Sequence, residues 1–166
     1  LAAKTGLTEQ ITRILYARGV DTAEKIRAFM SPSKDNFLSP FLMRGMDKAV
    51  EILSEKIDQQ KKIRIIGDYD IDGVTATYIF LTALRRCGAE VDYDIPDRIK
   101  DGYGINQQLI EQAYDEGIDT ILTCDNGIAA LEEIAYAKEM GLTVLVTDHH
   151  EIPFEERAAL SNAAKE

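Results

Sequence analysis

The spacing of the hydrophobic residues changes near residue 60. Before this point, apolar residues recur at the three- and four-residue spacing of a helix, as at Leu7, Ile11, Ile14 and Leu15. After it, short apolar runs alternate with amphipathic stretches, several of which end at a glycine. The pattern predicts a helical N-terminal extension over residues 1–60, followed by a region of alternating strands and helices.

Four short apolar segments after residue 60 are predicted to be strands, at residues 63–66, 91–95, 120–123 and 142–147. Helices are predicted between them, at residues 74–87, 107–116 and 129–140. Alternation of strands and helices with short turns favours βαβ units. We therefore expect an α/β fold, with a parallel β-sheet that is flanked by helices on both faces.

The composition is typical of a folded globular domain. The chain has 166 residues, of which 45% are hydrophobic and 29% are charged, and this excludes a disordered chain. No apolar run approaches the ~20 residues that cross a bilayer, so no membrane partner is expected. The net charge of −10 argues against a bare polyanion-binding surface. The two cysteines exclude a disulfide framework and fit a cytoplasmic location.

Acidic residues and both histidines directly follow the predicted strands. Ligands bind at the carboxyl ends of the strands in an open parallel sheet, so a site is expected there. The segments at these ends are Gly67-Asp68-Tyr69-Asp70-Ile71-Asp72-Gly73, Pro96-Asp97-Arg98, Cys124-Asp125-Asn126-Gly127 and Asp148-His149-His150. Carboxylates that share one crevice repel one another unless a cation binds. Oxygen and imidazole ligands suit Mn²⁺, Mg²⁺ or Fe²⁺, and two such ions commonly cleave phosphate esters.

The aspartates have two other interpretations. Their spacing also matches the start of a calcium EF-hand loop, Asp68-x-Asp70-x-Asp72-Gly73. That loop needs a Glu at its twelfth position, which here is Ile79, and a helix rather than a strand before it. Alternatively, each aspartate only forms a turn or caps a helix. Three acidic strand ends that meet at one crevice favour metal binding over both.

Three residues near the acidic segments are predicted to bind substrate. Gly73 opens a helix, and helix N-termini attract phosphate. Arg98 is the best candidate for a phosphate clamp, although pairing with Asp97 or Asp101 is an equally good interpretation of it. Tyr103 lies between two glycines in a turn that can approach the same crevice.

Together these motifs resemble the DHH phosphoesterase family, which is named after the triplet found here at Asp148-His149-His150. Residues 67–75, 95–104 and 123–127 resemble the other motifs of the family's RecJ branch, in the same order. The resemblance covers about residues 62–153, and the helical lead-in is similar to the N-terminal extension of that branch. It implies a sheet of the DHH-domain type over residues 61–153.

The resemblance also implies an activity. RecJ exonucleases digest single-stranded DNA from 5′ to 3′ in recombination and repair, with Mn²⁺ or Mg²⁺, and two ions are expected in the complete enzyme. Carried over by position, the metal ligands would be Asp68, Asp70, Asp125 and His149. His150 would contact the scissile phosphate or steady the attacking water. The remaining acids, Asp72 and Asp148, would be further ligands or would support the ligands from behind.

The chain departs from the family pattern at two points. Members carry a further metal-binding Asp and a substrate-binding domain after the triplet, and some have a His where this chain has Ile66. We therefore expect an incomplete domain with a tail at residues 154–166, missing C-terminal domains as partners, and little or no activity of the chain alone. The alternatives are a related phosphoesterase that cleaves oligoribonucleotides or cyclic dinucleotides, and a non-catalytic scaffold domain in replication.

Overall fold

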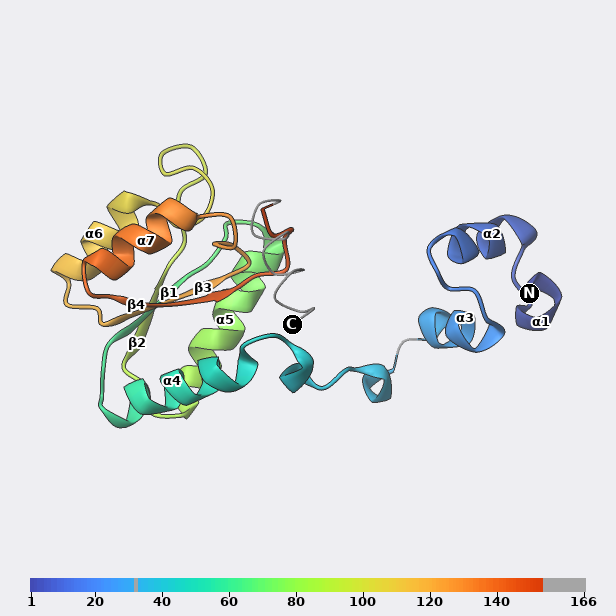
Figure 1. Cartoon of the computed structure of the whole chain (residues 1–166), viewed down its shortest axis with the longest axis horizontal. Coiled ribbons are helices and arrows are strands. Elements are labelled where there is room, and N and C mark those ends of the chain that lie inside the picture. The colour runs from blue at the N-terminus through green and yellow to red at the C-terminus, as the bar shows by residue number, and fades with distance from the viewer. Residues whose placement is uncertain (32, 154–166) are drawn as a thin grey trace, which may run out of the picture. The chain divides into compact units, whose positions relative to one another are not determined.

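The computed structural model describes residues 1–31 and 33–153 of the chain (Figure 1). The chain forms two compact units, Leu1–Met46 and the part from Asp47 onward. The first unit is helical, as predicted for the N-terminal extension. Its elements are α1 (Ala2–Thr5), α2 (Glu9–Ala17), α3 (Ala23–Met30) and the short 3₁₀ helices η1 (Lys34–Asn36) and η2 (Pro40–Leu42). The predicted tail at residues 154–166 lies outside the described residues.

Threonines begin the two longer helices of the first unit. The hydroxyl of Thr8 accepts a hydrogen bond from the Ile11 N–H, and that of Thr22 accepts one from the Lys25 N–H. Each bond satisfies a backbone donor that the first turn of a helix leaves free. The helices then bury Leu15 and Ile26, which are the apolar positions facing the interior of this unit.

The second unit is built on a four-stranded parallel sheet with the strand order β2-β1-β3-β4. Its strands are β1 (Ile63–Ile66), β2 (Val91–Asp94), β3 (Thr120–Cys124) and β4 (Thr143–Thr147). Ile66 lies beside Thr123, and Cys124 lies beside Thr147, so the central strands end almost level with each other. The expected α/β fold is confirmed. The loops that follow the strands therefore all leave the sheet at the carboxyl ends of the strands.

Helices cover both faces of this sheet (Figure 1). They are α4 (Met46–Asp58), α5 (Ile71–Arg86), α6 (Gln107–Asp115) and α7 (Leu131–Glu139). Helices α4 and α5 contribute to the core around Ile63 and Ile65. Helices α6 and α7 pack around Ile66 and Ile121 on the opposite face. The alternation of side chains along a strand thus supplies two separate apolar layers.

Helix α4 belongs to the unit that contains the sheet. Its apolar residues Leu53 and Ile57 pack against the cluster that includes Ile63 and Leu122. The compact unit accordingly begins at Asp47, whereas the sequence interpretation assigned residues 46–60 to the N-terminal extension. An amphipathic helix does not reveal from its own sequence which neighbour will cover its apolar face.

Helix α5 begins earlier than predicted. The Asp70 carboxylate accepts hydrogen bonds from the N–H groups of Asp72 and Gly73, both at 2.9 Å, and so fixes a first turn that starts at Ile71. Gly73 consequently lies inside this turn and does not open the helix. At 16 residues, α5 is the longest helix of the described chain. Neither it nor any other helix there is long and apolar enough to span a membrane.

Candidate metal site at the carboxyl ends of the strands

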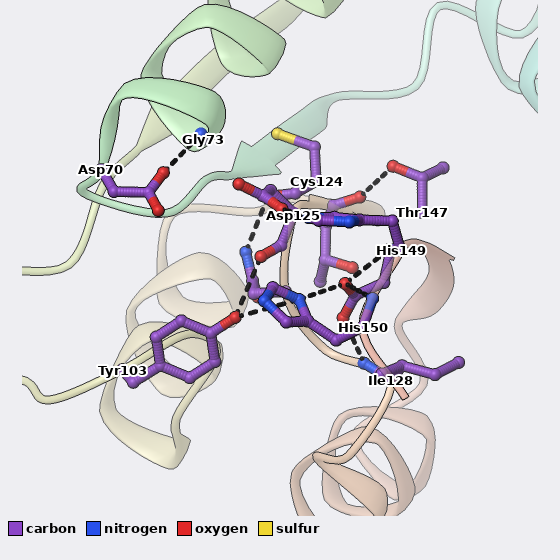
Figure 2. A network of polar contacts seen from close by, with 12 residues as sticks. Asp70, Gly73, Tyr103, Cys124, Asp125, Ile128, Thr147, His149 and His150 are labelled. Atoms are coloured by element: carbon purple, nitrogen blue, oxygen red, sulfur yellow. Dashed lines mark hydrogen bonds and ion pairs between the residues drawn. The ribbon is translucent and has the colours of Figure 1, made fainter. Parts of the chain in front are cut away.

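Two overlapping groups of potential metal ligands lie where β1, β3 and β4 end (Figure 2). In the first group, one oxygen from each of Asp68, Asp70 and Asp125 lies within 4.8 Å of the others. The second group joins Asp125 to His149 and His150 within the same limit. The structure therefore brings together the four residues predicted to bind metal, and Asp125 is common to both groups.

Asp125 occupies an unusual backbone position directly after β3. Its φ of 62° lies in the left-handed region, and its N–H donates to the Thr147 carbonyl at 3.0 Å. Only 8% of the residue is exposed. Its Oδ1 atom lies 2.8 Å from Nε2 of His149, but no donor among the described residues meets this oxygen with hydrogen-bond geometry. A buried carboxylate oxygen without a donor is costly, and a bound cation would satisfy it.

Asp68 is enclosed by its neighbours and is only 3% exposed. Burial raises the pKa of Asp68, and the charges of Asp70 and Asp125 act in the same direction against a hydrogen bond from the Tyr69 N–H. A Cβ atom at Gly73 would lie 2.5–2.6 Å from Asp68, including its backbone. Glycine is therefore required at this position, because α5 passes so closely behind Asp68. Ionisation of Asp68 therefore costs more here than it does in water, and a bound cation would offset that cost.

Asp70 and Asp72 differ although they are two residues apart. Asp70 uses Oδ1 to cap α5 and still belongs to the first group of potential ligands. Asp72 is exposed in the first turn of α5 and belongs to neither group among the described residues. Of the acids expected after β1, the structure thus brings two to the centre and leaves Asp72 at the rim.

Asp148 turns inward, and its side chain is only 1% exposed. Its Oδ2 atom accepts a hydrogen bond from the Ile128 N–H at 3.0 Å. Its Oδ1 atom accepts from the backbone N–H groups of His149 and His150 and lies 2.7 Å from His150 Nδ1. Burial alone would raise the pKa of Asp148, but these hydrogen bonds hold it below its ordinary value. Asp148 therefore belongs to neither group of potential ligands among the described residues, and it fixes the ring of His150.

Tyr103 reaches the site from the loop before α6. Its hydroxyl donates to the Asp125 carbonyl at 3.1 Å and lies 3.4 Å from His150 Nδ1 (Figure 2). Burial, helped by nearby carboxylates such as Asp148, raises the pKa of Tyr103 to about 12. The phenol therefore keeps its proton at neutral pH and acts as a donor. The hydrogen bond between the His150 ring and the Asp148 carboxylate raises the pKa of His150.

Arg98 lies at the rim of the site. Its guanidinium carbon is 5.3 Å from the centre of the Tyr69 ring, and this ring is edge-on to that of Tyr103. The carboxylates of Asp97 and Asp101 instead accept backbone N–H groups of their own loop. Within the described part of the chain Arg98 forms no ion pair, so the interpretation that it pairs with Asp97 or Asp101 is wrong. Its guanidinium edge remains available to an anion.

A cavity of about 460 Å³ opens beside His150. It lies between the Tyr103 loop and the start of α7, with Ile128, Ala130 and Glu133 on the α7 side. The metal-ligand groups therefore adjoin a space that can receive part of a substrate.

The sequence interpretation gave no role to Asn126, which is completely buried beneath the site. Its side chain bonds to Ile66, Cys124 and Ile105, which lie on three different segments. An asparagine after a strand is ordinarily a turn former, so its identity alone gave no signal. The neighbouring Cys124 is buried in the core, where its sulfur lies 3.3 Å from the Thr77 hydroxyl.

The profile described as "DHH family, N-terminal domain" matches residues 62–165, which is more than half of the chain. The chain belongs to the DHH family. The match includes every acidic segment of the site and both histidines. It also continues past residue 153, the end predicted for the domain from the sequence.

The relatives of this DHH chain are single-strand-specific exonucleases by name. It is 45% identical over 151 residues to the single-stranded-DNA-specific exonuclease RecJ of Bacillus subtilis, which covers 91% of this chain and 19% of the relative. It is 37% identical over 142 residues to RecJ of Escherichia coli, covering 84% and 24%. The chain thus spans about a fifth to a quarter of the length of these curated relatives.

Solved structures show the same relationship for this member of the DHH family. A crystal structure of exonuclease RecJ bound to manganese matches with a TM-score of 0.62 and 39% identity, over 66% of this chain and 28% of that one. RecJ from Thermus thermophilus in complex with Mn²⁺ matches with a TM-score of 0.63 and 31% identity, over 84% and 19%. The predicted resemblance to the RecJ branch is confirmed, as is the fold of the sheet and its helices.

Proposed function

We propose that this chain carries the metal-dependent catalytic centre of an exonuclease that digests single-stranded DNA from 5′ to 3′ in recombination and repair. The observation that carries the proposal is the cluster of Asp68, Asp70 and Asp125, in which a buried oxygen of Asp125 lacks a donor among the described residues. The names of the relatives support single-stranded DNA as the substrate over oligoribonucleotides and cyclic dinucleotides.

The ligands in this proposal are Asp68, Asp70, Asp125 and His149, and the cofactor is Mn²⁺ or Mg²⁺, with two ions in the complete enzyme. Carboxylates with one imidazole form a donor set that suits these ions. Bound there, the ions would supply Lewis-acid activation of water and would neutralise charge at the phosphate. Two solved RecJ structures that contain manganese support this choice of ion.

The residues of the chain then divide the work at the scissile phosphate. His150 contacts the phosphate or steadies the attacking water, because Asp148 and Tyr103 fix the orientation of its ring. Asp148 acts through His150 and is therefore a positioning residue. Asp72, at the rim, supports the ligands from outside. Water attacks phosphorus, the bond to the 3′ oxygen breaks, and a mononucleotide leaves with its 5′ phosphate.

The rim supplies the contacts to DNA in this proposal. Arg98 presents its guanidinium edge to a backbone phosphate, while the guanidinium lies over the Tyr69 ring. Tyr103 borders the cavity beside His150, where the terminal nucleotide would enter. Gly73 contributes indirectly, because it allows the start of α5 to approach Asp68.

Further domains of the whole protein would complete the substrate groove. The chain carries a net charge of −10, which does not attract a polyanion, and it spans only about a fifth to a quarter of the length of its relatives. We therefore expect weak turnover from the 166 residues alone. A DNA substrate and two free cysteines, Cys87 and Cys124, support a cytoplasmic location.

The experiment that tests this function is a calorimetric titration of Mn²⁺ into the chain. The matched variants are Asp125→Asn, which alters the shared ligand, and Asp115→Asn, which alters an exposed acid at the end of α6. Saturable binding that is lost only in Asp125→Asn supports the proposal. Equal binding by all three proteins contradicts the metal site. In a nuclease assay, robust release of label from the 3′ end of a DNA strand but not from its 5′ end contradicts the proposed 5′-to-3′ polarity.

A further inference from the structure

Asn126 is completely buried beneath the site, and its side chain forms three hydrogen bonds. Its Nδ2 atom donates to the carbonyl oxygens of Ile66 and Cys124, both at 3.0 Å. Its Oδ1 atom accepts from the Ile105 N–H at 3.2 Å. Both amide donors are thus used, and all three bonds are buried. Within the described residues, no hydrogen bond of this side chain reaches a potential metal ligand directly.

The two donors of Asn126 fasten strand ends. Ile66 is the last residue of β1, and Cys124 is the last residue of β3. Both carbonyls are the last of their strands, and they accept the two N–H donors of one amide. The asparagine therefore ties the two strand ends together at the points from which the chain continues to Asp68 and Asp125.

The acceptor of Asn126 fastens the loop at residues 97–106, which carries Arg98 and Tyr103. Gly104 in this loop has a φ of 71°, and a Cβ atom there would lie 3.3 Å from Asn126 Cβ. The Tyr103 hydroxyl holds the same loop to the Asp125 carbonyl at 3.1 Å. Two consecutive residues therefore anchor the loop, and one of them is also the shared potential ligand.

We propose that Asn126 is a positioning residue that holds the loop of Arg98 and Tyr103 at a fixed distance from the metal-binding carboxylates. The inference rests on the proposed function, which assigns the loop to substrate and the carboxylates to metal. Hydrolysis requires both groups to meet one phosphate, so a small displacement of the loop is expected to matter.

The first test compares Asn126→Ala with Thr120→Ala. Thr120 is equally buried but lies at the opposite end of β3, where its hydroxyl bonds, among the described residues, only to Asp119. At a temperature where circular dichroism shows all proteins folded, we expect Asn126→Ala to raise the Kd for Mn²⁺ about tenfold. Thr120→Ala is expected to change it less than about twofold, although it also lowers stability.

A second readout needs no metal. The rings of Tyr103 and His150 have centroids 6.0 Å apart, and only two histidines are present in the chain. The nuclear Overhauser effect between these rings therefore reports the position of the loop. We expect it to disappear in Asn126→Ala and to persist in Thr120→Ala.

A second pair of variants serves if Asn126→Ala does not fold. Gly104→Ala places a methyl group against Asn126, whereas Gly102→Ala meets no atom of the described chain within 4 Å. Both glycines have a positive φ, 71° and 81°, so the backbone strain is matched. Only Gly104→Ala is expected to lose the contact between Tyr103 and His150.

The outcomes separate this inference from the proposed function. If the unaltered chain fails to bind Mn²⁺, the proposed function fails, and the ring contact alone still decides the role of Asn126. Unchanged Mn²⁺ affinity together with an unchanged ring contact in Asn126→Ala and Gly104→Ala would overturn the inference. A loss as large in Thr120→Ala and Gly102→Ala would overturn it as well, since the effect would then be general destabilisation.

Discussion

The two ends of the sheet differ in whether their acidic residues have basic partners. At the amino end, Arg64 forms ion pairs with Asp92 and Glu116 at 2.6 and 2.5 Å, and Lys56 pairs with Asp119 at 2.6 Å. At the carboxyl end, the carboxylates of Asp68, Asp70 and Asp125 face one another, and Arg98, the nearest arginine along these loops, forms no ion pair in the described part of the chain.

The difference separates acids that are paired within the fold from acids that we propose to bind metal. Acids at the amino end have their countercharges within the chain, so they complete the fold. Those at the carboxyl end repel one another at a cost to the free energy of folding, and a bound cation would remove that cost. A surplus of negative charge at one end of the strands therefore says more about a possible cation site than the net charge of the chain does.

The largest expected effect concerns stabilisation by metal. Mn²⁺ at about 100 times its Kd should raise the free energy of unfolding by about 2.7 kcal/mol. In Asp125→Asn this increase should disappear, while the stability without metal should not fall, because a repulsive charge has been removed. Denaturant unfolding with and without Mn²⁺ measures both values, and an equal increase in the two proteins would refute the comparison.

The second effect concerns the amino end. Arg64→Ala leaves Asp92 and Glu116 without their countercharge and removes a side chain that is only 7% exposed. We expect a loss of about 2 kcal/mol in the free energy of unfolding, reduced from the cost at a buried pair because the partners are half exposed. Mn²⁺ affinity should stay within about twofold of the unaltered chain. A large change in affinity would show that the two ends are not independent.

The third effect depends on pH. Although burial opposes it, the hydrogen bond from Lys56 holds the pKa of Asp119 below its ordinary value of 3.8. A lowered pKa contributes stability that is present above pH 3.8 and is lost as the pH falls through the folded-state pKa. Asp119→Asn should therefore be less stable than the unaltered chain by about 1 kcal/mol at neutral pH. Urea titrations should show this stability difference between the two proteins vanish below the folded-state pKa of Asp119. A difference that stays constant with pH would contradict the assigned cause.

The smallest effect is expected for an exposed pair. Arg13 and Glu9 lie one helical turn apart in α2, and Nη2 of Arg13 is 2.9 Å from Oε1 of Glu9. Their side chains are 79% and 72% exposed. Glu9→Gln should lower stability by less than about 0.5 kcal/mol. The same urea titrations measure it, and added salt should abolish the difference. A loss as large as that in Arg64→Ala would mean that burial does not set the strength of these pairs.

Local patterns predicted most of the sheet and its helices. The strands were found because apolar runs and glycine stops are properties of neighbouring residues. The start of α5 was misplaced because capping and metal binding were treated as alternatives for the aspartates, whereas Asp70 caps the helix and also belongs to the cluster. The affiliation of α4 was missed because it depends on packing between distant segments.

The composition of the site was predictable, but the direction of its side chains was not. Asp148 lies in the family triplet, yet it faces the Ile128 N–H, a donor from another loop. Asn126 bonds to three segments that only the folded chain brings together. Arg98 rests on Tyr69, which is 29 positions earlier in the chain. These features depend on tertiary contacts, which periodicity and spacing do not encode.

Helix α5 also provides a molecular ruler. Asp70 caps its first turn beside the carboxylate cluster, and Cys87 follows its last residue with an exposed thiol, while Cys124 is buried. Sixteen residues of helix span about 24 Å. A spin label on Cys87 would therefore lie at a distance suited to paramagnetic measurement from an ion at the strand ends. The native sequence thus offers a single attachment point for locating that ion without an engineered cysteine.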